Sequence, residues 1–310
     1  LSGGTQLVPT LSYPPWLGYW PAVAAFFAFA WFELIYPRPD DPAVLAGAVI
    51  VYWSLTFLAV MLFGEATWLG RAEPFSVLFR CLGGLSPLVF ERAGATRRLT
   101  CSLAMPGAAL VGREPLPASA VLLILLALAS VSFDGLSRTF WWLGMGGINP
   151  LEYPGRTVLV ARNTFGLLLT WTVLASVYWL CAAGRAGRAV FSIMPIALAY
   201  HFSHYLTALL VNGQYALRAL SDPLAAEHNW LGLDAGHVTT SFLSNREGIT
   251  VIWNLQAGSI VTCHILAVLL ARLAYSRDGG TSRTAEMPLA AAMVLYTLFG
   301  LWLISTPVAA

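Results

Sequence analysis

Long apolar segments constrain this chain more than any other feature. About seven stretches of roughly 20 residues carry almost no charge, and a helix of that length crosses the hydrocarbon core of a bilayer. These segments are predicted at residues 16–36, 43–63, 118–134, 163–183, 189–211, 248–272 and 287–308. The pattern predicts an all-α, polytopic membrane helical bundle that forms a single domain over residues 1–310.

The composition supports the same class. Of 310 residues, 58% are hydrophobic and only 10% are charged, whereas a soluble domain carries about 25% charged residues. So few charges cannot cover a water-facing surface, so membrane lipid is the expected partner. The net charge is +2, and no basic run is longer than Arg97–Arg98, so nucleic acid is not an expected partner.

The segment between the second and third predicted spans, residues 64–117, has apolar runs that are too short to cross a membrane. Within it, residues 75–82 have the pattern of a short amphipathic helix that lies at the interface, with Arg80 toward water. A half-membrane hairpin at residues 103–111 is an alternative use of the same segment.

Arginine placement predicts the orientation, because basic residues are retained on the cytoplasmic side. With the N-terminus of this chain inside and the C-terminus outside, 11 arginines fall on inner segments and six on outer segments. The short loop at residues 183–189, which contains Arg185 and Arg188, is the clearest single case.

Two histidines, His201 and His204, lie inside an apolar predicted span, where an ionisable group is costly and tends to have a function or a partner. They are three residues apart and share a helix face. Glu33 and Asp134 are predicted at a similar depth, in the outer half of the membrane. Two imidazoles and a carboxylate can hold a divalent metal such as zinc, copper or iron, so His201, His204 and Asp134 are candidate metal ligands. A water bound to that metal could be a nucleophile.

Two alternative roles for the histidines stay open. Each imidazole could hydrogen-bond a neighbouring helix, or the pair could line a path for protons or substrate. His264 is predicted to lie about 10–15 Å deeper, which argues against a metal or a bis-histidine haem shared with His204. His264 is instead expected to make an interhelical hydrogen bond near Pro195, where a kink would widen the space beside His201.

The span with the two histidines is predicted to end at Asn212–Gly213, in a long outer loop over residues 212–247. That loop contains His228, Asp234 and His237. Long structured loops often carry function, so these side chains are further candidates above the histidine site.

Short patches along nearly the whole chain resemble a family of polytopic bacterial membrane proteins known as fenitrothion hydrolases. The matching patches are LGYWPAVAAFFAFAWFELIYPRP, FGEATWLGRAEPF, the SP of LSPL, the FD that ends at Asp134, the HY that begins at His204, the NGQ that ends at Gln214 and the SDP that contains Asp222. The resemblance implies hydrolysis of an organophosphate aryl ester in the bacterial inner membrane by one or two related components. It also implies catalytic roles for Asp134, His204, Gln214 and Asp222, and a chain that lacks an upstream N-terminal part.

Three functions from different classes follow from these observations. The first is a membrane hydrolase that uses a metal-activated water near the outer surface. The second is a permease for a small solute, with the polar cluster as its substrate site. The third is a non-catalytic subunit that docks a second membrane subunit. Walker, GxSxG and GxGxxG motifs are absent from the sequence, so ATP hydrolysis, a serine-hydrolase elbow and dinucleotide binding have no support.

Overall fold

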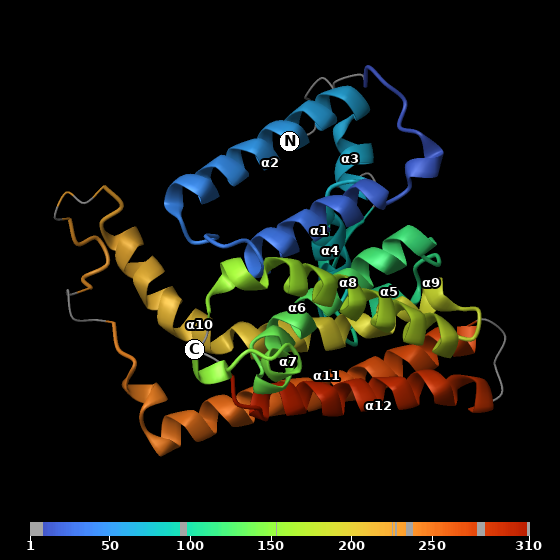
Figure 1. The fold of residues 1–310 in the computed structure, drawn as a ribbon. Coiled ribbons are helices and arrows are strands. Elements are labelled where there is room, and N and C mark those ends of the chain that lie inside the picture. Colours follow the sequence, from blue (N-terminus) through green and yellow to red (C-terminus); the bar gives the residue numbers. More distant parts are fainter. Residues whose placement is uncertain are drawn as a thin grey trace.

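The computed structural model is a bundle of helices in which α11 and α12 lie side by side and the short helix α3 runs across α1 and α2 (Figure 1). It describes residues 9–93, 98–152, 154–224, 226, 228–233, 238–277 and 283–308. The helices are η1 (Pro15–Leu17), α1 (Trp20–Leu34), α2 (Pro42–Phe63), α3 (Glu65–Arg71), α4 (Pro74–Gly83), α5 (Ala108–Val111), α6 (Ala118–Ser137), α7 (Phe140–Met145), η3 (Pro150–Glu152), α8 (Arg156–Cys181), α9 (Ala186–Ala189), η4 (Val190–Ile193), α10 (Met194–Ser221), η5 (Ser241–Leu243), α11 (Arg246–Arg277) and α12 (Arg283–Ser305).

Six of the described helical segments are long and apolar enough to cross a membrane, which confirms the multi-pass membrane class. They contain α2, α6, α8, α10, α11 and α12. The first predicted span corresponds to α1, which is apolar but has only 15 residues. At 1.5 Å per residue α1 is about 23 Å long, less than the roughly 30 Å of a hydrocarbon core.

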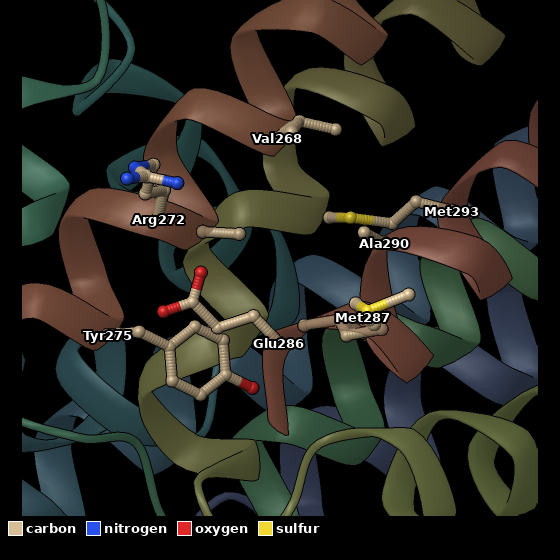
Figure 2. A pocket seen from close by; sticks show the side chains of 9 residues that line it. Val268, Arg272, Tyr275, Glu286, Met287, Ala290 and Met293 are labelled. Atoms are coloured by element: carbon tan, nitrogen blue, oxygen red, sulfur yellow. The ribbon is translucent and has the colours of Figure 1, made fainter. Parts of the chain in front are cut away.

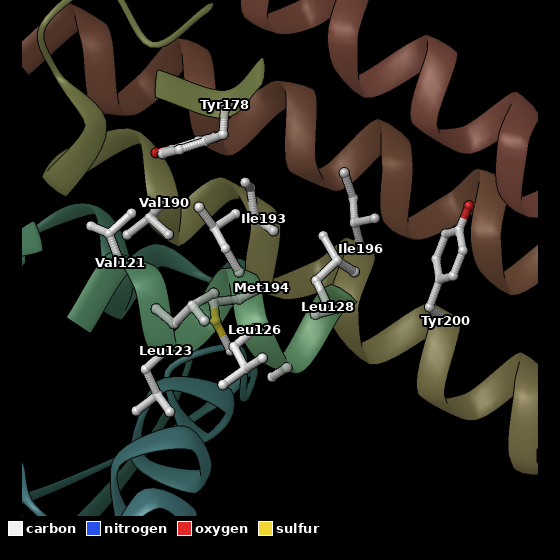
Figure 3. Close-up of a cluster of buried hydrophobic side chains, with 14 of the residues drawn as sticks. Val121, Leu123, Leu126, Leu128, Tyr178, Val190, Ile193, Met194, Ile196 and Tyr200 are labelled. Carbon is white, nitrogen blue, oxygen red and sulfur yellow. The ribbon is translucent and has the colours of Figure 1, made fainter. Parts of the chain in front are cut away.

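α6 is the central helix of the bundle. Almost its whole length is buried, and it packs against α1, α8, α10 and α12. Its large aliphatic side chains, including Leu123, Leu126 and Leu128, meet Ile193 and Met194 from η4 and α10 in one continuous core (Figure 3). By contrast, α2 buries almost none of its surface and packs mainly on α3.

The predicted break at Asn212–Gly213 is wrong, because α10 continues to Ser221. A glycine inside a helix costs about 1 kcal/mol. Ending the helix at this point would leave backbone groups near the membrane without partners, which costs more. The connection between α10 and α11 is therefore shorter than the 212–247 loop expected from the sequence.

Pro195 lies in the first turn of α10, directly after the 3-10 turn η4 and inside the longer helical segment Ala186–Ser221. The change from 3-10 to α geometry therefore falls at the proline. The kink expected at Pro195 stays a prediction.

The segment between α2 and α6 contains the predicted short helix as α4, and Arg80 donates hydrogen bonds to the carbonyls of Leu69 (2.6 Å) and Gly70 (3.3 Å). It also contains an antiparallel hairpin that was not predicted, β1 (Leu88–Ala93) with β2 (Arg98–Leu103). Only the single turn α5 follows, so a membrane hairpin at residues 103–111 is not formed.

Glu73 caps α4 and joins it to α2. Its carboxylate accepts hydrogen bonds from the backbone N–H groups of Phe75 (3.0 Å) and Ser76 (2.5 Å) and from the hydroxyl of Tyr52 in α2. The side chain is buried, with Glu73 only 5% exposed. Burial by itself pushes the pKa of Glu73 upward, but the hydrogen bonds from Ser76 and Tyr52 outweigh it and hold the pKa below its ordinary value of 4.5.

We expect Glu73→Ala to lower the free energy of unfolding by about 1–2 kcal/mol at neutral pH, because it removes a helix cap. Since the folded-state pKa is below the ordinary value, this stabilisation is complete above pH 4.5 and is lost as the pH falls through the folded-state pKa. Unfolding of wild type and variant in detergent, followed from neutral to acidic pH, measures the difference. Glu65→Ala, at an exposed position in the first turn of α3, is the control. An equal loss in both variants would contradict the role of Glu73.

Candidate functional site

The candidate site is an Asp–His pair between α6 and α10. Nε2 of His204 lies 2.6 Å from Oδ2 of Asp134. An ionised carboxylate only accepts hydrogen bonds, so the imidazole donates its Nε2–H and the proton-accepting nitrogen is Nδ1. The side chain of Asp134 is 10% exposed and that of His204 is 29% exposed. The carboxylate is thus buried behind a partly exposed imidazole.

Local sequence explains why the pair forms where it does. Asp134 lies one turn before the end of α6, and His204 lies ten residues into α10. Because α6 is the buried centre of the bundle, the carboxylate at its end cannot be solvated freely. A charged hydrogen bond to the facing helix supplies the missing partner.

A cation lies on the other side of the carboxylate. Nε of Arg138, one turn later on the same chain, is 3.9 Å from Oδ1 of Asp134. Its side chain is 54% exposed, so the guanidinium reaches out from the site. Arg138 was not predicted from the sequence, although its position four residues after Asp134 on a helix was a usable signal.

A second acid lies next to the pair. The hydroxyl of Tyr205 donates to Oε1 of Glu33 in α1 at 3.2 Å, and the Tyr205 ring packs edge-on against His204 with centroids 4.8 Å apart. Arg156, at the start of α8, donates to the backbone carbonyls of Glu33 (2.8 Å) and Tyr36 (3.4 Å). Ionisable side chains from α1, α6, α8 and α10 therefore gather at one end of the bundle, which we call the dyad end.

The Nδ1 atom of His201 is bonded within its own helix and not to the Asp134–His204 pair. Its Nδ1 donates to the carbonyl of Ala197 at 2.8 Å, a bond within its own helix. Across the described residues, no group of three or more His, Cys, Asp or Glu side chains is placed to hold a metal ion. As arranged, the predicted set of His201, His204 and Asp134 does not fit a metal. Nε2 of His204 and Oδ2 of Asp134 are hydrogen-bonded to each other, and Nδ1 of His201 is bonded to its own helix.

Gln214 and Asp222 lie farther along α10. They are about 15 Å and 27 Å from His204 along the helix axis. The amide of Gln214 makes three hydrogen bonds, to the carbonyls of Leu210 and Thr239 and from the backbone N–H of Thr239, so it joins α10 to the loop before α11. Asp222 ends α10 and accepts from the backbone N–H of Ala226 at 2.9 Å. The structure does not bring either residue to the pair.

His264 makes the expected interhelical hydrogen bond, with Nδ1 2.8 Å from Oγ1 of Thr297 in α12. In the loop before α11, the ring of His228 stacks on Trp230 with centroids 6.1 Å apart. The other two loop candidates, Asp234 and His237, lie outside the described residues.

A large apolar cavity lies away from the pair. This space of about 720 Å³ between α8 and α12 is lined from α6 by Leu128, Ser132 and Leu136. Asp134 is two residues from Ser132, which rotates it by about 200° around the helix. The cavity and the Asp134–His204 pair are therefore on opposite faces of α6.

Fold and site together define a multi-pass helical membrane protein with an Asp–His pair buried at one end of its bundle. No protein-family model, curated protein or solved structure matches the chain.

We expect the free energies of unfolding of Asp134→Ala, His204→Ala and the double variant to be non-additive by about 1–3 kcal/mol, because each single variant leaves a buried partner unpaired. Unfolding in detergent micelles of the wild type and the three variants measures this coupling. As a control, Asp134→Ala combined with Thr297→Val, which removes the partner of His264 from α12, should be additive. Additivity of the Asp134 and His204 effects would show that the pair is not formed in the membrane protein.

Proposed function

We propose that this protein is a membrane hydrolase in which His204, oriented by Asp134, activates a water molecule for attack on an ester. The observation that carries the proposal is the 2.6 Å contact between Nε2 of His204 and Oδ2 of Asp134, with the imidazole partly exposed. A histidine fixed by a carboxylate on one nitrogen presents the other nitrogen as a general base.

The reaction would proceed in one displacement. Nδ1 of His204 takes a proton from water while the water oxygen forms a bond to the phosphorus or carbonyl carbon of the ester. The bond to the leaving alkoxide or aryl oxide breaks, and the leaving oxygen then receives the proton from the imidazolium. Asp134 stabilises that imidazolium, and the exposed guanidinium of Arg138 is placed to meet the charge that develops on a phosphoryl oxygen.

The ester class follows from the resemblance to fenitrothion hydrolases and from the surroundings of the pair. An organophosphate aryl ester is neutral and apolar, so it partitions into a bilayer and can reach a histidine at membrane depth. The bacterial inner membrane, with the dyad end outside, belongs to the same proposal. Its support is the arginine distribution, which places Arg185 and Arg188 at the opposite end.

We expect the purified protein to release nitrophenol from a dialkyl nitrophenyl phosphate. His204→Ala should lower the rate by about 10²–10⁴-fold, the usual contribution of a general base, and Asp134→Asn should lower it in the same direction while keeping the shape of the site. The rate is measured by absorbance in detergent or proteoliposomes.

His264→Ala is the matched control, because it removes an equally intramembrane histidine that bonds Thr297 instead of Asp134. It should leave the rate unchanged. Equal rates for wild type and His204→Ala, with both proteins folded, would sink the proposal. Loss of activity on treatment with a chelator, restored by zinc, would return the predicted metal to the mechanism.

Transport is the second candidate, and the convergence of ionisable side chains from four helices favours it. Such clusters inside a membrane commonly bind solutes or protons. Uptake of intact ester into proteoliposomes, lost in His204→Ala and without hydrolysis, would establish a permease. Co-purification of a second membrane subunit in fixed ratio, with neither uptake nor hydrolysis, would establish a non-catalytic subunit.

A further inference from the structure

The hairpin β1–β2 carries an apolar face that is exposed. Leu88 pairs with Leu103 and Phe90 pairs with Cys101, so these four side chains lie on the same face of the two strands. Leu88 is 48% exposed, Phe90 is 63% exposed and Leu103 is 81% exposed. The thiol-bearing residue Cys101 is exposed as well. The described part of the chain therefore leaves this face open.

The opposite face of the hairpin is more polar. It carries Thr100 and Ser102, both exposed, beside the half-buried Val89. Among the described elements, each strand packs mainly on the other strand, and two strands alone cannot hide an apolar face. A sheet that is apolar on one side and polar on the other suits a boundary between hydrocarbon and water.

The chain that follows the hairpin fixes its base to the bundle. Gly107 lies so close to α11 that a Cβ atom there would be 2.6 Å from Cδ1 of Leu270. Leu110 of α5 is fully buried. A few residues later, the backbone N–H of Leu116 donates to the carbonyl of Gly187 in α9 at 2.8 Å. The hairpin is thus held at the end of the bundle opposite the dyad end.

The last turns of α11 show that this end is where the apolar part of the bundle stops. A pocket of about 320 Å³ between α11 and α12 has the apolar Val268 at one side, whereas Arg272, Tyr275 and Glu286 lie together at another (Figure 2). Leu270, which contacts the base of the hairpin, lies between Val268 and Arg272 in α11. The hairpin therefore starts at the depth where hydrocarbon gives way to polar groups.

Arginines flank the hairpin on both sides. Arg80 ends α4 and is exposed, and NH2 of Arg113 donates to the Arg80 carbonyl at 3.3 Å. Residues 80–114 contain five arginines and two glutamates. A basic segment beside membrane-spanning helices is attracted to the anionic phosphates of the lipid headgroups. Both the charge of this segment and its depth favour a lipid surface as its partner.

We propose that the hairpin lies in the headgroup layer of the bilayer, with Leu88, Phe90, Cys101 and Leu103 toward the acyl chains and Ser102 toward water. The outer edges of a two-stranded sheet have unpaired backbone N–H and C=O groups, which exclude it from the hydrocarbon core. In the headgroup layer these groups stay hydrated while the apolar face is covered. The site lies away from Asp134 and His204, so the proposal is independent of the proposed hydrolysis.

Fluorescence quenching in proteoliposomes tests this proposal, because Cys101 lies on the apolar face. The full chain, with Cys81, Cys181 and Cys263 replaced by alanine, is labelled with bimane at Cys101. It is then reconstituted in phosphatidylethanolamine and phosphatidylglycerol that contain a nitroxide lipid. Quenching should be at least about twofold stronger than for bimane on the polar face, at Ser102→Cys in a Cys101→Ala chain. Both positions are on one strand, so the orientation of the protein in the vesicle affects them equally.

A charge on either face provides a matched pair of further variants. Leu103→Asp places a carboxylate on the apolar face at a highly exposed residue, so it should lower the quenching of bimane at Cys101 without disturbing the core. Ser102→Asp, on the polar face, should leave that quenching unchanged.

Two results would overturn the proposal. One is equal quenching of bimane at Cys101 and at Ser102→Cys. The other is shielding of Cys101 from aqueous iodide without quenching by the nitroxide lipid, which would show that a second copy of the chain or another protein covers this face.

Discussion

The buried carboxylate of Asp134 needs a hydrogen-bond donor or a cation beside it. Much of the arrangement at the dyad end follows from that constraint. Asp134 is the only ionisable residue of α6, and α6 is the most buried long helix among the described residues. Removing a lone carboxylate from water costs many kcal/mol, so the bundle must bring it a donor or a cation. It brings both, His204 from α10 and Arg138 from the following turn. The register between α6 and α10 is thereby tied to a polar contact as well as to packing.

α6 also separates two kinds of space. One face carries the polar pair, and the opposite face forms the floor of the apolar cavity through Leu128, Ser132 and Leu136. A 100° step per residue allows both on the same helix without a conflict. The polar pair and the apolar cavity are thus on different sides of one central helix. This division explains why the apolar cavity does not open onto the Asp134–His204 pair.

Some features of the site could be predicted from the sequence, and others could not. The choice of His204 and Asp134 as neighbours rested on their similar depth in two predicted spans that run in the same direction, and the structure brings them together. His201 lies one turn deeper on the same predicted helix face, yet its Nδ1 bonds its own helix. Depth along a helix can be counted in residues, but the direction in which a side chain points around that helix depends on how neighbouring helices pack. The prediction for Asn212–Gly213 failed for a related reason, because a local propensity of about 1 kcal/mol was outweighed by the context of the bundle.

The sequence by itself determined the class of this protein. Segments of about 20 uncharged apolar residues leave a membrane helical bundle as the way to satisfy the backbone without water. Only the tertiary structure decided which polar groups meet, because those contacts join α1, α6, α8 and α10 across 70 to 172 positions of chain. It also decided that two cavities adjoin beside α12, since a cavity is what remains after side chains from several helices have packed. Hydrophobicity is a property of each segment, whereas a site is a property of the spaces and contacts between segments.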